Sequence, residues 1–293
     1  MKRKCVWQVN KTTIVYKKNS EFEINGDFYA TSKDNAPVIV YIHGGGLVWG
    51  SKEDLKEEQI HFYLEDGFNI FSIDYRLAPE TKLPEIKTDI ADALLWVKQE
   101  GTKHFNYDPN KIVVIGGSAG GFLSLLTGIF EVKPNAIVSF YGYGDLTGDW
   151  AHRPSPHYAK MTPVPKELAD MLVTKEVITI GPIQKRYAIY MHGRQTGEWM
   201  KSISGLNRED LKEYSPLYQI EENYPPTLLL HGTDDEDVPY EQSVLMAEAL
   251  TKANIDNKLI TIPNGKHVFD ADWNHPEVKK AFDEVIEFLR KYV

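Results

Sequence analysis

The 293-residue sequence contains a single cysteine, Cys5. One cysteine cannot form an internal disulfide, so stability requires no oxidising compartment, and we expect a cytoplasmic protein. No stretch approaches the ~20 consecutive apolar residues of a membrane-spanning helix. The chain begins with a charged run at residues 1–4. Because Gln8, Asn10 and Lys11 interrupt the segment behind it, a secretion signal is not predicted.

The sequence also lacks an excess of positive charge and any motif for a metal or a nucleotide. Its formal net charge is −9, which disfavours a nucleic acid or an anionic membrane surface as the main partner. No cluster of histidine, cysteine or carboxylate has the spacing of metal ligands, and no glycine-rich loop ends in Lys-Ser or Lys-Thr. We therefore expect neither a metal nor a cofactor.

The composition that remains is that of an ordinary globular protein, with 42% hydrophobic and 26% charged residues. One large domain over residues 1–293 accounts for this length. Apolar runs predict eight strands, at 12–18, 22–30, 38–42, 69–73, 111–115, 135–140, 227–230 and 258–262. Helical periodicity is expected near 54–65 and 84–100, from 119, and near 240–252 and 276–292. Such alternation is typical of an α/β protein with a mostly parallel sheet flanked by helices.

The alternation breaks down after the sixth predicted strand, from about residue 145 to residue 223. Prolines interrupt this stretch at positions 154, 156, 163 and 165. It is too rich in aromatic residues and in helical periodicity to be a mere linker. We interpret residues 145–223 as an insertion that forms a lid or cap.

The run Gly116-Gly117-Ser118-Ala119-Gly120 lies directly between a β-branched strand and an apolar helix start. A tight strand-to-helix turn holds a serine hydroxyl above the sheet, where a base and a bound carbonyl can both reach it. Glycines flank such a serine because the reversal brings backbone segments too close for a Cβ. Ser118 is therefore a candidate nucleophile, although a turn that only feeds a helix is the alternative interpretation.

Other chemically active side chains follow other predicted strands, and in an open parallel sheet these strand ends lie together. His43-Gly44-Gly45-Gly46 follows the third strand, the acidic run 234–237 follows the seventh, and His267 follows the eighth. Together with Ser118 they have the chain order serine, acid, histidine, which is the order of the α/β-hydrolases.

On these motifs the sequence resembles the α/β-hydrolase superfamily, specifically the hormone-sensitive-lipase-like esterases and acetyl esterases. Four segments between residues 43 and 267 carry the resemblance: His43–Gly46, Asp74–Glu80, Gly116–Gly121, and His231–Asp235 with Gly265–His267. It implies an α/β-hydrolase fold, with an eight-stranded sheet flanked by helices and a lid after strand 6. Gly117 departs from the pattern, because it stands where these esterases often carry an acidic residue.

The resemblance assigns the roles that acyl transfer needs. Ser118 attacks the carbonyl carbon, and His267 takes the serine proton and later delivers it to the leaving alcohol, since imidazole titrates near neutral pH. His275 is a rival base, but its place directly before Pro276 suits a helix start better.

The acid must fix the histidine from behind and stabilise its charged form. The loop of the resembled family reads His-Gly-x-x-Asp-x-x-Val-Pro, and this frame fits residues 231–239 with Asp235 as the acid. Asp234 and Asp237 remain alternatives, or else they are solvated loop acids or partners of the next helix start.

Backbone N–H groups of Gly45, Gly46 and Ala119 are expected to stabilise the oxyanion, because glycines let a carbonyl approach closely. The residues after these glycines are expected to line the substrate pocket together with one aromatic residue of the insertion. They are Leu47, Val48, Trp49 and Trp150.

Four further polar residues are expected to have structural roles. His43 organises the glycine loop, and His231 packs at the end of its strand. Asp74 and Arg76 form a salt-linked turn that supports the glycine loop.

The expected function is that of a serine carboxylesterase that cleaves a small-molecule ester, with a short or acetyl acyl group, through an acyl-enzyme. An arylformamidase or a peptidase of the same fold would use the same triad, although no large appended domain of the prolyl-oligopeptidase type is present. A non-catalytic homologue that binds a small molecule is a third interpretation, but such proteins usually lose a triad member. Homo-oligomerisation is left open.

Overall fold

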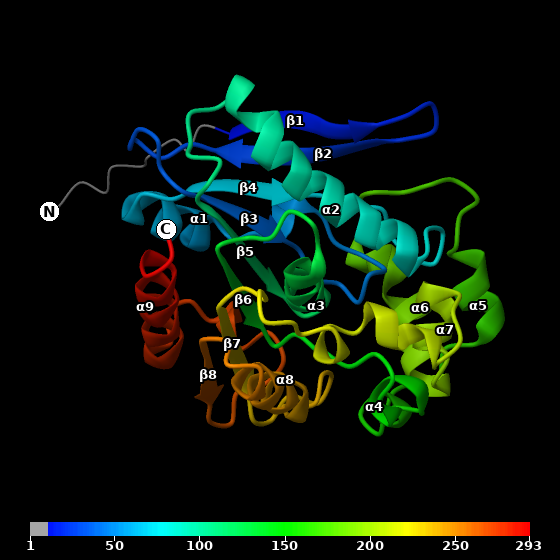
Figure 1. Cartoon of the computed structure of the whole chain (residues 1–293). Coiled ribbons are helices and arrows are strands. Elements are labelled where there is room, and N and C mark those ends of the chain that lie inside the picture. The colour runs from blue at the N-terminus through cyan, green and yellow to red at the C-terminus, as the bar shows by residue number, and fades with distance from the viewer. Residues whose placement is uncertain (1–10) are drawn as a thin grey trace, which may run out of the picture.

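The computed structural model describes residues 11–293. Cys5 and the charged run at residues 1–4 lie outside the described residues. The prediction that there is no secretion signal used this charged run. The fold is built on one eight-stranded sheet in the order β1-β2-β4-β3-β5-β6-β7-β8 (Figure 1). The strands are β1 (Lys11–Lys18), β2 (Glu23–Tyr29), β3 (Val38–Ile42), β4 (Asn69–Ile73), β5 (Ile112–Gly117), β6 (Ala136–Phe140), β7 (Thr227–Gly232) and β8 (Asn257–Ile262).

Strand β2 pairs antiparallel with both β1 and β4. The strands from β3 to β8 pair in parallel, with β3 between β4 and β5. The predicted eight-stranded, mostly parallel sheet is therefore confirmed.

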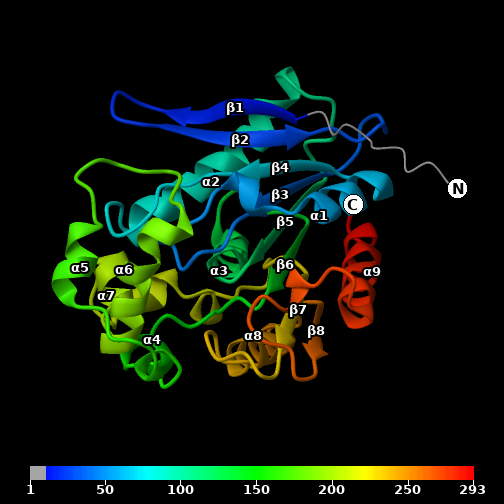
Figure 2. The ribbon, with the colours of Figure 1, turned by 180° about the vertical axis from the view of Figure 1, so that it is seen from behind.

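Helices cover both faces of the sheet (Figures 1 and 2). One face is covered by α1 (Glu57–Asp66) and α9 (Pro276–Arg290), and the other by α2 (Leu83–Gln99), α3 (Ala119–Leu126) and α8 (Glu241–Lys252). Alternate strand residues point to opposite faces, so Val38 and Val40 join the core under α2 and α3, whereas Ile39 joins the core under α1 and α9. The buried residues of α9 recur at helical spacing, which gives it one apolar face.

The helix predicted near 54–65 is in fact two elements. Ser51 and Asp54 form a capping pair, in which Ser51 Oγ accepts the N–H of Glu53 and Asp54 Oδ2 accepts the N–H of Ser51. This pair caps a short 3₁₀ turn, Lys52–Asp54, and α1 begins only at Glu57, because the backbone at Leu55 is extended.

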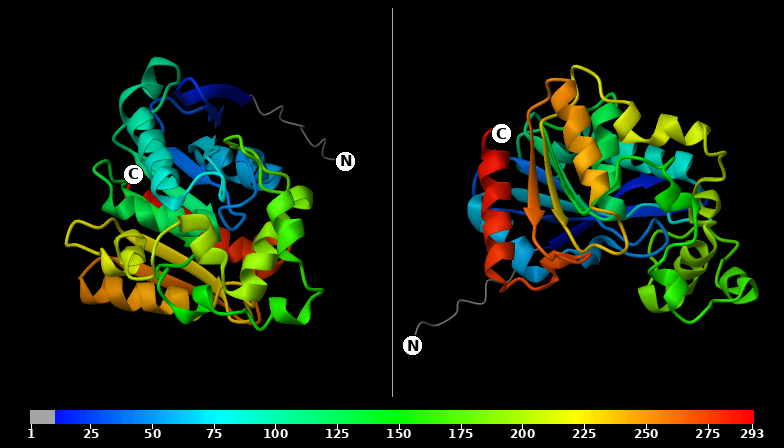
Figure 3. Two further views of the ribbon diagram at one scale, coloured as in Figure 1. Left: turned by 90° about the vertical axis from the view of Figure 1, so that its right-hand side faces the viewer. Right: turned by 90° about the horizontal axis from the view of Figure 1, so that it is seen from below.

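Between β6 and β7 the chain forms the helices α4 (Asp149–His152), α5 (Lys166–Met171), α6 (Ile183–Thr196) and α7 (Trp199–Ser204). They lie beyond the carboxyl ends of the parallel strands, and the left view of Figure 3 looks onto them. We refer to this group of helices as the cap.

Within residues 11–293, no helix combines the length and apolar content needed to cross a bilayer.

Candidate active site

Ser118 lies at the turn between β5 and α3, with φ 56° and ψ −121°. A non-glycine residue with positive φ is strained, and such strain collects at functional turns. Gly120 follows it because a Cβ there would meet the carbonyl oxygen of Ile42, at the end of the neighbouring strand β3. The Ser118 N–H donates to the Phe140 carbonyl at 2.9 Å, which fixes the turn to β6.

The structure brings Ser118, His267 and Asp235 together in one hydrogen-bonded row. His267 Nε2 lies 3.0 Å from Ser118 Oγ, and His267 Nδ1 lies 2.7 Å from Asp235 Oδ2. With its proton on Nδ1, the imidazole donates to the carboxylate and offers Nε2 to the serine hydroxyl. This is the tautomer that a general base requires.

Asp235 is fixed on both of its oxygens. Oδ1 accepts the N–H groups of Asp237 and Val238, each at 2.9 Å, and Oδ2 faces His231 Nε2 at 3.2 Å as well as His267. Burial acts to raise the pKa of Asp235, but the hydrogen bonds from His231 and His267 outweigh it and hold that pKa well below its usual value. The carboxylate therefore stays ionised, whereas its neighbour Asp234 is exposed.

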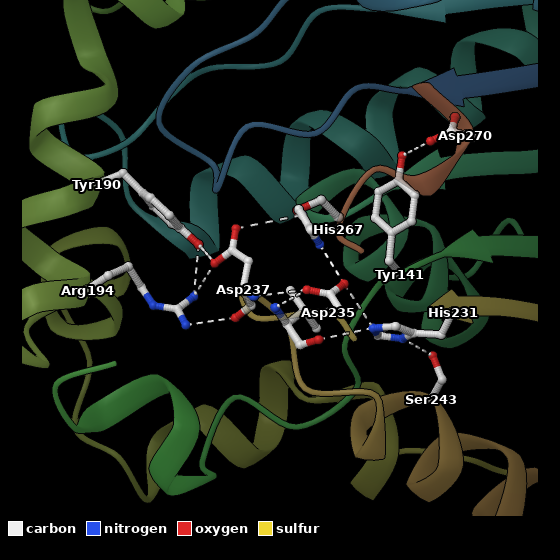
Figure 4. A network of polar contacts seen from close by, with 11 residues as sticks. Tyr141, Tyr190, Arg194, His231, Asp235, Asp237, Ser243, His267 and Asp270 are labelled. Carbon is white, nitrogen blue, oxygen red and sulfur yellow. Dashed lines mark hydrogen bonds and ion pairs between the residues drawn. The ribbon is translucent and has the colours of Figure 1, made fainter. Parts of the chain in front are cut away.

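His231 is completely buried and packs at the end of β7. Its Nε2 faces two acceptors, the Asp235 carboxylate and the Val238 carbonyl, and its Nδ1 lies 2.7 Å from Ser243 Oγ (Figure 4). Nε2 therefore carries the proton and donates, while Nδ1 accepts from the serine hydroxyl. His231 thus orients the acid.

The groups around His267 shift the pKa of its imidazole. Burial acts to lower its pKa, but the hydrogen bond to Asp235 and the nearby charge of Asp237 outweigh burial and raise the pKa above the usual 6.5. The ring also packs edge-on against Tyr141, with centroids 4.9 Å apart.

The glycine loop after β3 lies beside the serine. Gly45 has φ 96° and Gly46 φ 59°, a backbone region that favours glycine. Added side chains would meet the Trp49 carbonyl at Gly45 and the Tyr190 ring at Gly46. Within the part of the chain that the structure describes, the N–H groups of Gly45, Gly46 and Ala119 have no hydrogen-bond acceptor. These donors are free to bind a ligand oxygen.

Tyr75 supports this loop, and the sequence reasoning overlooked it. Its hydroxyl donates to the carbonyls of His43 (3.0 Å) and Gly44 (3.2 Å), and its ring stacks on His43 at 4.2 Å. His43 is completely buried, and burial lowers its pKa to about 4. Tyr75 lies within the segment Asp74–Glu80, so its place in that motif was the available signal.

Asp74 and Arg76 each form an ion pair, but with a partner outside the predicted turn. Asp74 pairs with Lys52 at 3.4 Å, and Arg76 pairs with Asp89 at 2.8 Å. Ion pairs to Lys52 and Asp89 thus hold the two charges, while Tyr75, which lies between Asp74 and Arg76, makes the contacts to the glycine loop.

A cavity of about 280 Å³ opens at Ser118 and His267. Its apolar walls include Trp49, Ile183 and Val268, and its polar walls include Asp54, Lys56, Gln59, Asp237 and Asp270. Trp49 is therefore where the sequence analysis expected it. Asp237 belongs to the loop after β7. The other polar walls come from α1, from the turn before it and from the segment after His267, whose sequences carry no recognisable motif.

Three of the expected pocket residues lie elsewhere. Leu47 and Val48 are buried in the core, because the tight turn from Gly45, with φ 64° at Leu47, directs both side chains inward. Trp150 packs inside the cap against Tyr143 and Trp199, and its indole N–H donates to the Asp145 carbonyl. A residue next to a binding loop in the sequence need not point into the binding site. Where the chain reverses, the backbone angles decide whether its side chain faces the cavity or the core.

Gly117 is explained by a tyrosine. A Cβ at Gly117 would lie against the Tyr141 ring, and the Tyr141 hydroxyl donates to Asp270 Oδ1 at 2.7 Å (Figure 4). Gln59 donates to the other oxygen of Asp270 at 2.9 Å. Tyr141 and Asp270 thus occupy the space beside the position where the resembled esterases often have an acid.

Among residues 11–293, no group of three or more His, Cys, Asp or Glu side chains is placed to hold a metal ion.

Comparison with known proteins gives matches over most of the chain. The family model BD-FAE matches residues 27–250. A non-reducing polyketide synthase of Stereocaulon alpinum is 30% identical over 88% of this chain, which corresponds to 12% of that protein. The chain thus spans about an eighth of the length of this curated relative.

Solved structures share the whole fold. An α/β-hydrolase superfamily protein from Enterococcus faecalis is 22% identical with a TM-score of 0.78, covering 96% of this chain and 99% of its own. An esterase of Thermogutta terrifontis is 23% identical with a TM-score of 0.71, covering 96% and 92%. The expected α/β-hydrolase fold is confirmed. Since the family model covers most of its length, the chain belongs to the BD-FAE family.

Proposed function

We propose that this chain is a serine hydrolase that cleaves small carboxylic esters through an acyl-enzyme on Ser118. The observation that carries the proposal is the continuous row from Ser118 Oγ to His267 Nε2 (3.0 Å) and from His267 Nδ1 to Asp235 Oδ2 (2.7 Å). Nucleophile, base and orienting acid are each within hydrogen-bond distance of the next, which is the arrangement that nucleophilic catalysis needs.

The acylation step follows from this row. His267 Nε2 takes the Ser118 proton as Oγ forms a bond to the ester carbonyl carbon, and the carbonyl electrons move onto its oxygen. The free N–H groups of Gly45, Gly46 and Ala119 receive this oxyanion. When the tetrahedral intermediate collapses, the carbon–oxygen bond to the alcohol breaks and His267 protonates the leaving oxygen.

Deacylation repeats the same chemistry with water. His267 removes a proton from a water molecule, the hydroxide attacks the acyl carbonyl, and the free acid leaves as Ser118 regains its proton from His267. Asp235 stays ionised throughout, because its hydrogen bonds lower its pKa, and it stabilises the imidazolium in both steps.

The size and walls of the cavity favour a small ester. A space of about 280 Å³ beside Ser118 has room for a short acyl group or a small alcohol. The similar esterase of Thermogutta terrifontis has been solved with propionate bound, and a short acyl chain is what we propose here. The insertion 145–223 acts as the cap over this space, with Ile183 of α6 as one wall.

The nucleophile assignment is tested by Ser118→Ala. We expect hydrolysis of p-nitrophenyl acetate to fall by roughly 10⁶ in turnover, because the acyl-enzyme can no longer form. The control is Ser32→Ala, which removes an exposed hydroxyl far along the chain and should hydrolyse at the wild-type rate. Near-wild-type turnover by folded Ser118→Ala would overturn the mechanism. A series of p-nitrophenyl esters of increasing acyl length then tests the preference for short chains.

A further inference from the structure

Asp237 lies beside His267 on the side opposite to Asp235. Its Oδ2 is 3.7 Å from His267 Nε2, the nitrogen that also faces Ser118, and its side chain is only 15% exposed. It lines the catalytic cavity. The mechanism above gives this second carboxylate no role, although it lies next to the proton that the reaction transfers.

The cap holds Asp237 in this place. Its Oδ1 accepts the hydroxyl of Tyr190 at 2.7 Å and Arg194 Nη1 at 3.0 Å, and its backbone carbonyl accepts Arg194 Nη2 at 2.8 Å (Figure 4). Tyr190 and Arg194 are one helical turn apart on α6, and Arg194 also donates to the Tyr190 hydroxyl. Because these donors occupy Oδ1, the other carboxylate oxygen is directed toward His267.

Arg194 forms a largely buried ion pair with Asp237. Its side chain is 3% exposed, and its guanidinium lies 5.1–5.5 Å from the ring centroids of Trp150, Tyr158, Tyr190 and Trp199. These rings stabilise a cation, but a buried guanidinium still needs a counter-ion, and Asp237 is the carboxylate with which it pairs.

The charged and titratable groups around His267 come from several elements. They are Asp235 and Asp237 of the loop after β7, Arg194 of α6, Tyr141 after β6, Asp270 after β8, and Asp54 and Lys56 before α1. Two carboxylates contact the imidazole itself, one at each nitrogen, and both favour its protonated form. Arg194 acts in the opposite direction from behind Asp237.

We propose that Asp237 is a positioning residue that stabilises protonated His267 from the Nε2 side, and that α6 sets the strength of this stabilisation through Arg194 and Tyr190. Protonated His267 is the form that follows attack by Ser118, so Asp237 lowers the free energy of that state. The inference rests on the proposed function for the role of His267 as base. It couples the placement of the cap to the basicity of the catalytic histidine.

The direct test is an NMR titration of the His267 imidazole, with its resonance identified among the nine histidines by its loss in His267→Gln. Asp237→Asn keeps the shape and one acceptor oxygen but removes the charge, so the His267 pKa should fall by about one unit. Asp234→Asn removes an exposed charge from the same loop and should leave the pKa unchanged. An unchanged pKa in Asp237→Asn, or an equal fall in Asp234→Asn, would overturn the proposal.

The role of the cap is tested by Arg194→Met, which removes the opposing cation. The His267 pKa should then rise, opposite to the effect of Asp237→Asn, and Arg194→Lys should restore the wild-type value. A purely structural role would give no such opposite signs, so shifts in the same direction would contradict the coupling. If Arg194→Met does not fold, the proposal is tested by Arg194→Lys and Asp237→Asn. A large shift of the His267 pKa in Arg194→Lys, without one in Asp237→Asn, would contradict the electrostatic role.

A second readout is the pH dependence of kcat/KM, whose acidic limb should move with the NMR pKa in each variant. The titration needs no substrate, so the two proposals can fail separately. If Ser118→Ala retained activity while the titration shifts appeared, only the proposed function would fail. If Ser118→Ala were inactive and the shifts were absent, only the role of Asp237 would fail.

Discussion

Two adjacent carboxylates, Asp234 and Asp235, have opposite surroundings. Asp234 is exposed, whereas the Asp235 side chain is completely buried and receives hydrogen bonds on both oxygens. The difference arises because backbone N–H groups of the same loop turn toward Asp235. At the scale of single residues, the loop itself therefore selects which of these two adjacent carboxylates contacts the histidine.

The assignment of Asp235 as the orienting acid is tested by comparing substitutions of these two residues. Asp235→Asn should lower kcat for p-nitrophenyl acetate by about 10⁴, the loss known for this exchange in a serine-protease triad, because an amide favours the wrong histidine tautomer. Asp234→Asn should retain nearly the wild-type kcat. Equal and small losses in both variants would show that another carboxylate orients His267.

The cap helix α6 carries two arginines on its buried face. Arg186 donates to the carbonyls of Val48 and Ala78 and pairs with Glu80 at 2.6 Å, with both side chains at most 5% exposed. Arg194, two turns later, holds Asp237. At the scale of elements, one helix thus joins the glycine loop to the loop of the catalytic acid. A charged residue on the inner face breaks the apolar periodicity, which explains why the bounds of this helix were not predicted.

This helix anchor can be tested by stability. Arg186→Ala leaves Glu80 buried without its cation, so the free energy of unfolding should fall by about 3–5 kcal/mol in a urea titration. Arg153→Ala is the matched control, because it breaks the exposed pair with Asp149 and should cost at most about 1 kcal/mol. A loss for Arg186→Ala as small as that of the control would mean that the anchor is not buried in solution.

At the scale of the whole molecule, pH should affect folding through His43. Burial lowers its pKa in the folded state to about 4, whereas the unfolded chain has the ordinary value of about 6.5. A lowered histidine pKa contributes stability that is complete above pH 6.5 and is lost as the pH falls toward 4. The buried Asp74, whose pKa burial raises to about 6, acts with the opposite sign between pH 6 and its ordinary value.

The contribution of His43 is isolated by comparison with His43→Phe, which keeps a ring stacked on Tyr75 but cannot titrate. The difference in unfolding free energy between wild type and variant should shrink by about 3 kcal/mol between pH 6.5 and 4, while groups common to both cancel. Denaturant titrations at several pH values measure it. A difference that does not change with pH would show that His43 is not buried as a neutral ring.

Much of the architecture could be predicted from the sequence. All eight strands and the sheet class were predicted from local patterns, and Ser118, an acidic loop and His267 were predicted to meet because they follow strand ends. The choice of Asp235 within that loop rested on the resemblance to the esterases. The pocket could be predicted only in part. Trp49 lines it, but Leu47 and Val48 turn into the core, since the direction of a side chain in a reversing loop depends on the backbone angles of that loop.

By itself the sequence determined the order of the strands, the order of the helices outside the cap and the strained turn at Ser118, because apolar spacing and glycine act over a few residues. Only the tertiary structure decided which groups surround that turn. Tyr75 under the glycine loop, Tyr141 beside Gly117, and Arg194 paired with Asp237 join segments dozens of residues apart. Such contacts leave no periodic signal in the sequence. A buried charge or hydroxyl needs a hydrogen-bond or ion partner, and the fold decides which distant residue supplies it.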